Sequence, residues 1–203
     1  MKNFIFLILA MLMTITSFAQ NDYFDTDQSG FSLTGQISSY ESSTLLGIGG
    51  GYTSEGKITI GINLGIEESR EYNLTSTLAR PYLSFRVVRQ GENNSPLNIS
   101  MGIAYQHNTF KSLELTAGTI NFSLGASHRI SSTSNLVVIP FAGIGYNRTK
   151  INTDLQWFSN RQSGVGFTVG TSLLFNKFHI TPTLSFADGN SNFNLLFGLL
   201  FPL

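Results

Sequence analysis

The stretch Lys57–Ser69, KITIGINLGIEES, places an aliphatic residue at every second position. These residues are Ile58, Ile60, Ile62, Leu64 and Ile66, and the residues between them are small, polar or acidic. Successive side chains of a β-strand point to opposite faces, so this period of two predicts a strand with one apolar and one polar face. The fold then depends on what the apolar face contacts, a protein core or lipid.

The same alternation recurs along the rest of the chain, and no convincing apolar period of 3.6 residues lasts for three helical turns. We therefore predict an all-β chain of about ten strands, with eight strands as the alternative. A break in the alternation near Thr119 predicts a bulge, and Pro140 and Pro182 predict bulges or local breaks because proline lacks an N–H group. The predicted apolar faces are Phe31–Ile37, Leu46–Tyr52, Ile58–Ile66, Leu83–Val87, Leu97–Tyr105, Ile120–Ala126, Leu136–Tyr146, Val165–Phe175, Phe178–Phe186 and Phe193–Phe201.

The connections between these segments form two alternating sets. One set is short, and the other is generally longer and richer in charged and polar residues. Short periplasmic turns and longer outer loops are typical of barrels inserted into the outer membrane. The short set comprises Thr53–Lys57, Gln90–Pro96, Ser131–Asn135 and Asn176–Lys177, and the longer set comprises Ser69–Ser76, Asn108–Ser112 and Asn147–Gln162.

The distribution of charge indicates which face of the strands contacts water and which contacts lipid. The apolar faces carry no charged residue, as expected where Arg or Lys at the bilayer midplane costs about 2 to 4 kcal/mol. Tyr52, Tyr105 and Tyr146 close three apolar faces, as in the aromatic girdles of membrane barrels. We predict a closed antiparallel transmembrane β-barrel, and a soluble lipocalin-like binder with an apolar cavity is the alternative. The charged residues assigned to the opposite, lumenal face are Glu67, Arg80, Arg86 and Arg129.

The N-terminus and the composition fit an exported protein. Residues 1–19 are predicted to be a signal peptide, with Lys2, an apolar run and a small-x-small site at Ser17–Ala19; a membrane anchor is the alternative. Residues 20–30 are expected to be a polar, mobile lead-in, and residues 31–203 the barrel. The 203-residue chain has 12 basic and 12 acidic residues and no cysteine, which argues against nucleic-acid binding, disulfides and lipid attachment at a cysteine.

From Phe31 to Leu203 the chain resembles small outer-membrane β-barrel proteins of Gram-negative bacteria, particularly the single-domain barrels common in Bacteroidetes. The resemblance is carried by VVIPFAGIGYN (Val137–Asn147) and by the last strand, FNLLFGLLFPL. The last strand is similar to the C-terminal signal read by the barrel-assembly machinery, with Gly198, Phe201 and Leu203 at its key positions, although an aromatic residue usually ends it. The resemblance implies an outer-membrane location, contact with membrane lipids and the assembly machinery, and a monomer.

Motifs that suggest chemistry are few. GYTSEGKI (Gly51–Ile58) has the glycines and lysine of a phosphate-binding loop, but it lacks the following Ser or Thr and helix, so we interpret it as a turn. The three histidines do not have metal-site spacing. His107 at the outer rim is the basis of an alternative hydrolase function, either protease or lipid-modifying, by analogy with ten-stranded outer-membrane proteases. Its candidate loop carboxylates are Glu68, Glu71, Glu114 and Asp154.

The leading functional prediction is a structural or interaction role in the cell envelope. A barrel of about ten strands has a narrow lumen filled by side chains, so general porin activity is not expected. Glu67 and Arg80 are expected to face each other in the lumen as a structural plug. The Asn147–Gln162 loop, with Trp157 and with Arg148, Lys150 and Arg161, suggests an adhesive surface. We predict no catalytic, cofactor-binding or metal-binding residues.

Overall fold

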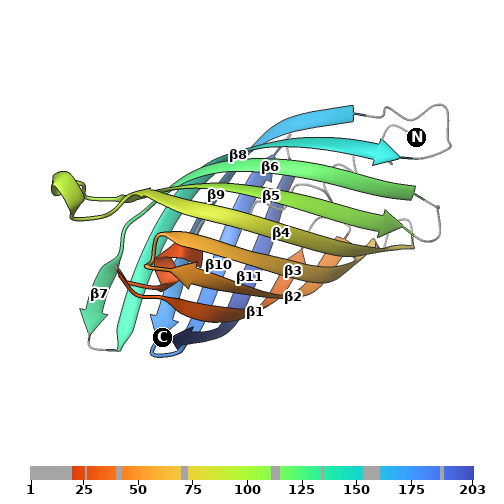
Figure 1. The fold of residues 1–203 in the computed structure, drawn as a ribbon. Helices are drawn as coiled ribbons and strands as arrows, with labels where there is room; N and C mark the ends of the chain where they lie inside the picture. Colours follow the sequence, from red (N-terminus) through yellow and green to blue (C-terminus); the bar gives the residue numbers. More distant parts are fainter. Residues whose placement is uncertain are drawn as a thin grey trace.

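The computed structural model describes residues 20–25, 27–39, 43–69, 73–110, 115–133, 135–152, 161–187 and 190–203. They form one antiparallel sheet that closes into a barrel (Figure 1). None of the helices in this part of the chain is long and apolar enough to cross a membrane. The strands are β1 (Gly30–Ser39), β2 (Ser43–Ser54), β3 (Ile58–Ser69), β4 (Leu74–Val88), β5 (Asn98–Phe110), β6 (Leu115–Ser127), β7 (Ile130–Thr133), β8 (Leu136–Asn152), β9 (Arg161–Phe175), β10 (Phe178–Ala187) and β11 (Asn190–Pro202).

The barrel closes by two pairings that the order of strands along the chain does not make obvious. β1 pairs with β11 as well as with β2, and β6 pairs with β8. The short strand β7 pairs with β8 directly beyond the end of β6, so β6 and β7 share one position around the barrel. The result is a ten-stranded barrel, which confirms the predicted strand number and excludes the eight-strand alternative.

The exterior of the barrel is apolar. On β3, Ile60 is 59% exposed and Ile62 is 47% exposed, whereas Thr59 between Ile58 and Ile60 is completely buried toward the lumen. The same alternation leaves exposed Leu, Ile, Val and Phe side chains around the whole barrel. So large an apolar surface is not stable in water, and a closed ladder satisfies the backbone in lipid. The outward face therefore contacts lipid, and the lipocalin-like alternative is wrong.

The strand prolines lie where the ladder is interrupted. The β9–β10 pairing skips Pro182 and the residue before it, and the β4–β5 pairing skips Pro81 and its predecessor. Pro140 lies on β8 at the step between its pairings with β6 and β7. The breaks predicted at Pro140 and Pro182 are thus confirmed, because each missing N–H faces a gap in the ladder.

The bulge predicted near Thr119 is wrong. The register of β6 is continuous through Thr119 with both β5 and β8. The apolar pattern changes parity because Leu115 and Ala117 face inward and are buried, while Ile120, Phe122 and Leu124 face lipid. The register irregularities lie instead at Arg86–Val88 and at Ser131–Thr133.

We call the end where β1 begins and β11 ends the proximal end, and the opposite end the distal end. Both ends of the predicted Asn147–Gln162 loop are strand, because β8 reaches Asn152 and β9 begins at Arg161, and residues 153–160 lie outside the described residues. The longer connection between β4 and β5, with the short helix η2 (Glu92–Asn94), projects at the proximal end (Figure 1). The expected contrast of short proximal turns and long distal loops is therefore weaker than predicted. Past the apolar belt the outward faces of β8 and β9 become polar, while inward residues such as Phe110, Leu115 and Ile151 are apolar and buried.

Candidate functional site

The proximal mouth of the barrel contains the N-terminal segment of the same chain. Residues 20–25, which we call the plug segment, begin with the short helix η1 (Gln20–Tyr23). Asp22, Tyr23 and Phe24 are each 3% exposed or less. We expected a mobile lead-in here, but the segment packs inside the barrel against inward-facing side chains of several strands.

Asp22 fixes the plug segment to the barrel wall. Its Oδ1 lies 2.9 Å from Nη2 of Arg86 on β4, and both side chains are buried. Its Oδ2 accepts a hydrogen bond from Ser127 at the end of β6. The guanidinium of Arg129 donates to the Asp22 carbonyl oxygen at 2.7 Å. Burial raises the pKa of the Asp22 carboxyl, and the neighbouring Arg86 opposes that rise.

Tyr23 packs on a histidine for which a glycine makes room. Its ring centroid lies 4.3 Å from that of His179 on β10, and its hydroxyl is 3.2 Å from Oγ1 of Thr181. Burial raises the pKa of Tyr23 to about 12. A Cβ atom at Gly198 would lie 2.8 Å from His179 Nε2, so the glycine of the C-terminal strand leaves space for this ring. Gly198 of the last strand thus allows His179 of β10 to pack against Tyr23 of the plug segment.

Phe24 anchors the plug segment in an apolar cluster. Its side chain is 2% exposed, and it packs among inward-facing residues of β8, β9 and β11. Burying a phenylalanine stabilises a structure by about 1.5 to 3 kcal/mol relative to leaving it in water. Most of the other buried residues are polar, although a second, smaller apolar cluster is formed by Leu45 and Leu78. The members of the Phe24 cluster are Tyr23, Phe24, Ile139, Phe141, Leu174 and Leu200.

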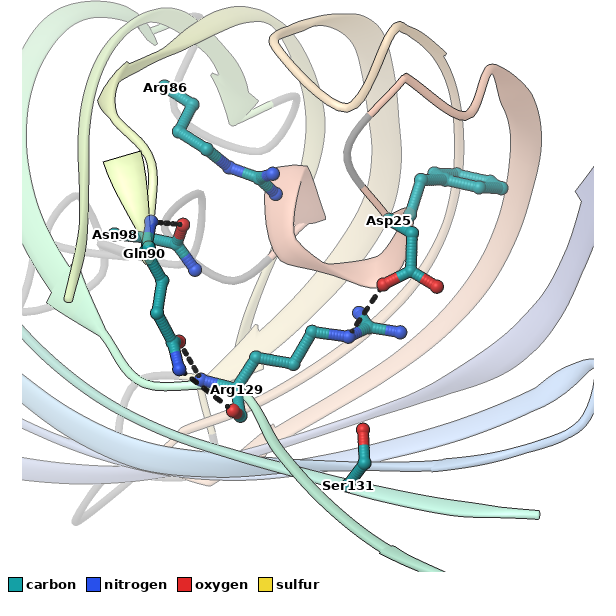
Figure 2. Close-up of a pocket in the computed structure, with 8 residues that line it drawn as sticks. Asp25, Arg86, Gln90, Asn98, Arg129 and Ser131 are labelled. Atoms are coloured by element: carbon teal, nitrogen blue, oxygen red, sulfur yellow. Dashed lines mark hydrogen bonds and ion pairs between the residues drawn. The ribbon is translucent and has the colours of Figure 1, made fainter. Parts of the chain in front are cut away.

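A polar cavity of about 320 Å³ remains beside the plug segment. Figure 2 shows Arg129 extending toward Asp25, with its Nε 2.9 Å from Asp25 Oδ1. Gln90 holds the Arg129 backbone from the other side by accepting from its N–H at 2.7 Å and donating to its carbonyl at 3.2 Å. The Gln90 N–H in turn donates to Asn98 Oδ1. The two arginines that line this cavity, Arg86 and Arg129, pair with Asp22 and Asp25 of the plug segment, so their charges are compensated within the chain.

The predicted Glu67–Arg80 plug is not formed. Both side chains face the lumen and are buried, as expected, but they lie at different levels of the β3–β4 ladder. Glu67 is opposite Ser76, and Arg80 is opposite Asn63. The Glu67 carboxylate accepts a hydrogen bond from Ser43 at 3.2 Å. Sequence spacing alone suggested a pair across the hairpin, whereas the register separates the two residues by four positions.

The predicted rim histidine faces away from the lumen. His107 is exposed on the outer side of β5, and its Nε2 is 3.4 Å from Oγ1 of Thr109. Glu68 is exposed on β3, two strands away, and the other candidate carboxylates, Glu71, Glu114 and Asp154, lie outside the described residues. Within the described residues, no three His, Asp or Glu side chains are grouped to hold a metal ion. This geometry does not favour the hydrolase alternative.

The GYTSEGKI stretch forms the tight turn that the sequence predicts. Gly56 has a φ of +56° between β2 and β3, a conformation that glycine adopts without strain. The Gly56 N–H donates to the Gln28 carbonyl, just beyond the plug segment. This turn therefore helps to hold the chain that leads from the plug segment into β1.

Comparison of the sequence with protein-family models and with curated proteins finds no match. Comparison with solved structures finds β-barrels. The β domain of the Bordetella autotransporter BrkA is 11% identical, with a TM-score of 0.54, over 87% of this chain and 100% of that chain. LpxR from Salmonella typhimurium is 12% identical over 87% of this chain and 85% of that chain, with a TM-score of 0.47. Ail of Yersinia pestis is 12% identical over 88% and 100%, with a TM-score of 0.42.

At such low identity the likeness to the BrkA domain shows the fold alone. Together with the apolar exterior and the closed ladder, it defines the class of protein. The chain is a ten-stranded transmembrane β-barrel whose proximal mouth contains its own N-terminal segment.

Proposed function

We propose that this chain is a monomeric outer-membrane β-barrel of the small Bacteroidetes type, with a structural or interaction role and a lumen closed to general solute diffusion. The signal-like residues 1–19 and the C-terminal strand favour export and insertion by the barrel-assembly machinery. The apolar exterior and the fold shared with the BrkA domain agree with this location. Outer-membrane barrels have short turns on the periplasmic side, so we place the proximal end in the periplasm.

The observation that carries the proposal is the burial of the plug segment in the proximal mouth. Asp22, Tyr23 and Phe24 occupy the space through which a solute would pass. Closer to the distal end, inward polar side chains of the same strand or of neighbouring strands form hydrogen bonds with one another along the inner wall of the barrel. Gln106 donates to Asn108 at 2.9 Å, and the hydroxyls of Thr119 and Thr149 are 2.8 Å apart. A narrow barrel filled in this way does not act as a general pore.

Planar-bilayer recording tests the closed lumen. The purified full chain should show no large steady conductance, whereas a variant lacking residues 20–28 should show frequent openings, because its proximal mouth has lost the plug segment. Heat-modifiable migration of both proteins serves as the control for barrel closure. A large steady conductance of the full chain would overturn the closed-lumen proposal.

Membrane fractionation tests the location. The protein should remain with outer-membrane fractions after washing in high salt and should be released only by detergent, since its exterior is apolar around the whole barrel. Recovery in the soluble periplasmic fraction would contradict an integral outer-membrane protein. This result is independent of the conductance measurement, so location and closure can fail separately.

A further inference from the structure

Three cations project from the outer wall of the barrel at the distal end. Arg148 and Lys150 lie on β8 and Arg161 lies on β9, and all three are exposed on the outward face. The sequence suggested that they belong to a long adhesive loop. Because they lie on paired strands instead, their relative positions are fixed by the ladder rather than by loop conformation.

The ladder places these cations next to one another. Lys150 is directly opposite Arg161, and Arg148 is opposite Ser163 one step closer to the apolar belt. Directly opposite residues have Cβ atoms about 4.5 to 5.5 Å apart, and like charges in such a pair are destabilising.

The apolar belt begins immediately below the cations. The next outward pair is Tyr146 and Val165, 44% and 47% exposed, followed by Ile144 and Phe167. A tyrosine at the end of an apolar strand face marks the level of the lipid headgroups in membrane barrels. Arg148 and Lys150 therefore lie at or just outside the headgroup level, with a continuous lipid-facing surface beneath them.

The carboxylates of the described residues lie away from Arg148 and Lys150. The three ion pairs found within the described residues, made by Arg86, Arg89 and Arg129, are all near the proximal end. Glu68 faces outward near the distal end, but it lies on β3, four strands from β8 in the barrel. Arg161 already has a partner group within the chain, so our argument rests on Arg148 and Lys150.

A tyrosine two strands away places its hydroxyl over the strand next to Lys150. Gly118 on β6 is directly opposite Lys150. Because it is a glycine, no side chain lies between Lys150 on β8 and the facing residues of β5. The Tyr105 hydroxyl leans over this glycine, since a Cβ atom at Gly118 would lie only 2.7 Å from it. His107 is opposite Gly118 on the other side. The Tyr105 hydroxyl and Lys150 thus lie on either side of Gly118, and Arg148 is the next outward residue of β8 toward the belt.

We propose that Arg148 and Lys150, together with the Tyr105 hydroxyl, bind the phosphate-bearing headgroup of a membrane lipid at the distal boundary of the barrel. Guanidinium and ammonium groups form strong charge-assisted hydrogen bonds with phosphate oxygens. The apolar belt below them accommodates the acyl chains of the same molecule. This continuity of cations and belt distinguishes a lipid from free phosphate, which needs no apolar surface.

Native mass spectrometry of the detergent-solubilised full chain tests the proposal with bisphosphorylated lipid A as the probe and diacylglycerol, which has no phosphate, as the uncharged control. The Arg148→Gln/Lys150→Gln variant should lose roughly thirtyfold in affinity for lipid A, because each cation near an anionic lipid surface contributes to binding. Arg148→Lys/Lys150→Arg should retain most of the affinity. The matched control is Lys57→Gln/Lys177→Gln, which removes two exposed cations from proximal turns.

The outcomes separate the sources of phosphate. Unchanged lipid A affinity in Arg148→Gln/Lys150→Gln, or equal loss in the proximal control, would overturn the assignment. Inorganic phosphate at millimolar concentration that displaces lipid A completely would show a free-anion site instead. Loss of heparin binding with lipid A binding unchanged would show that the occupant is a soluble polyanion. Heat-modifiable migration confirms that each variant is folded.

Discussion

The carboxylate of Asp22 lies 2.9 Å from the guanidinium of Arg86 inside the barrel, with both side chains shielded from solvent. The two residues come from the plug segment and from β4, so this ion pair joins the plug segment to the barrel wall. Removing one partner of a buried ion pair leaves the other charge poorly compensated. The pair should therefore control whether the plug segment stays in the lumen.

Asp22→Asn should favour release of the plug segment by about 3 to 5 kcal/mol, the usual cost of breaking a buried ion pair. Chymotrypsin cleavage after Tyr23 or Phe24, followed by mass spectrometry, measures the released population. Asp27→Asn is the matched control, because Asp27 is 79% exposed in its pair with Arg89 and should matter by less than about 1 kcal/mol. Equal cleavage of the two variants would contradict the role of Asp22.

Phe24→Ala should also favour release, by about 3 to 5 kcal/mol, because it removes a buried ring from the apolar cluster. The same protease assay applies, since Tyr23 remains as a cleavage site. Phe31→Ala deletes a ring of the same size from the lipid-facing side of β1 and should leave the plug segment in place. If the cleavage rate of Phe24→Ala stays at the wild-type value, the cluster does not hold the segment.

The raised pKa of Tyr23 predicts that the plugged state loses stability at alkaline pH. Its pKa is raised by burial from 10.0 to about 12, so the plugged state favours the neutral phenol. The contribution of Tyr23 is thus complete below about pH 10 and is lost as the pH rises through about 12. A spectrophotometric titration of Tyr23→Phe should show one late-titrating tyrosine fewer than that of the wild-type protein. Identical titration curves for the two proteins would place Tyr23 in water.

The lipid-facing belt predicts that an arginine on the outward face of β3 destabilises the barrel more near the middle of the membrane than near its edge. Ile62→Arg should destabilise the barrel in vesicles by about 2 to 4 kcal/mol, whereas Ile58→Arg near the proximal turn should cost about 1 kcal/mol or less. Both residues face outward on the same strand, so the variants differ mainly in depth. Denaturant titration with heat-modifiable migration measures the free energy of unfolding. Similar values for both variants would mean that water, not lipid, contacts Ile62.

The barrel could be predicted from the sequence because its signal is local. The alternation of Ile58 to Ile66 depends only on residues two positions apart, and the structure repeats it in the outward and inward faces of β3. The limits of the strands were harder to predict. Beyond Tyr146, β8 continues with residues that are all polar except Ile151, and such a stretch resembles a loop when hydropathy is the guide.

The plug segment was missed because its partners are distant in the sequence. Asp22 finds Arg86, Ser127 and Arg129 only after the barrel has closed, and a stretch rich in Asp suggests solvent. Two signals were present: the adjacent aromatic residues Tyr23 and Phe24 in a polar stretch, and arginines predicted to face a narrow lumen, where they need counter-charges.

The charges at the proximal mouth also determine what an opened barrel would conduct. Asp22, Asp25 and Asp27 each pair with an arginine that remains attached to the barrel: Arg86, Arg129 and Arg89. Withdrawal of the N-terminal chain would carry away three negative charges and leave three positive ones at the entrance. The resulting pore would be anion-selective, so its reversal potential in a salt gradient would shift toward the equilibrium potential of chloride.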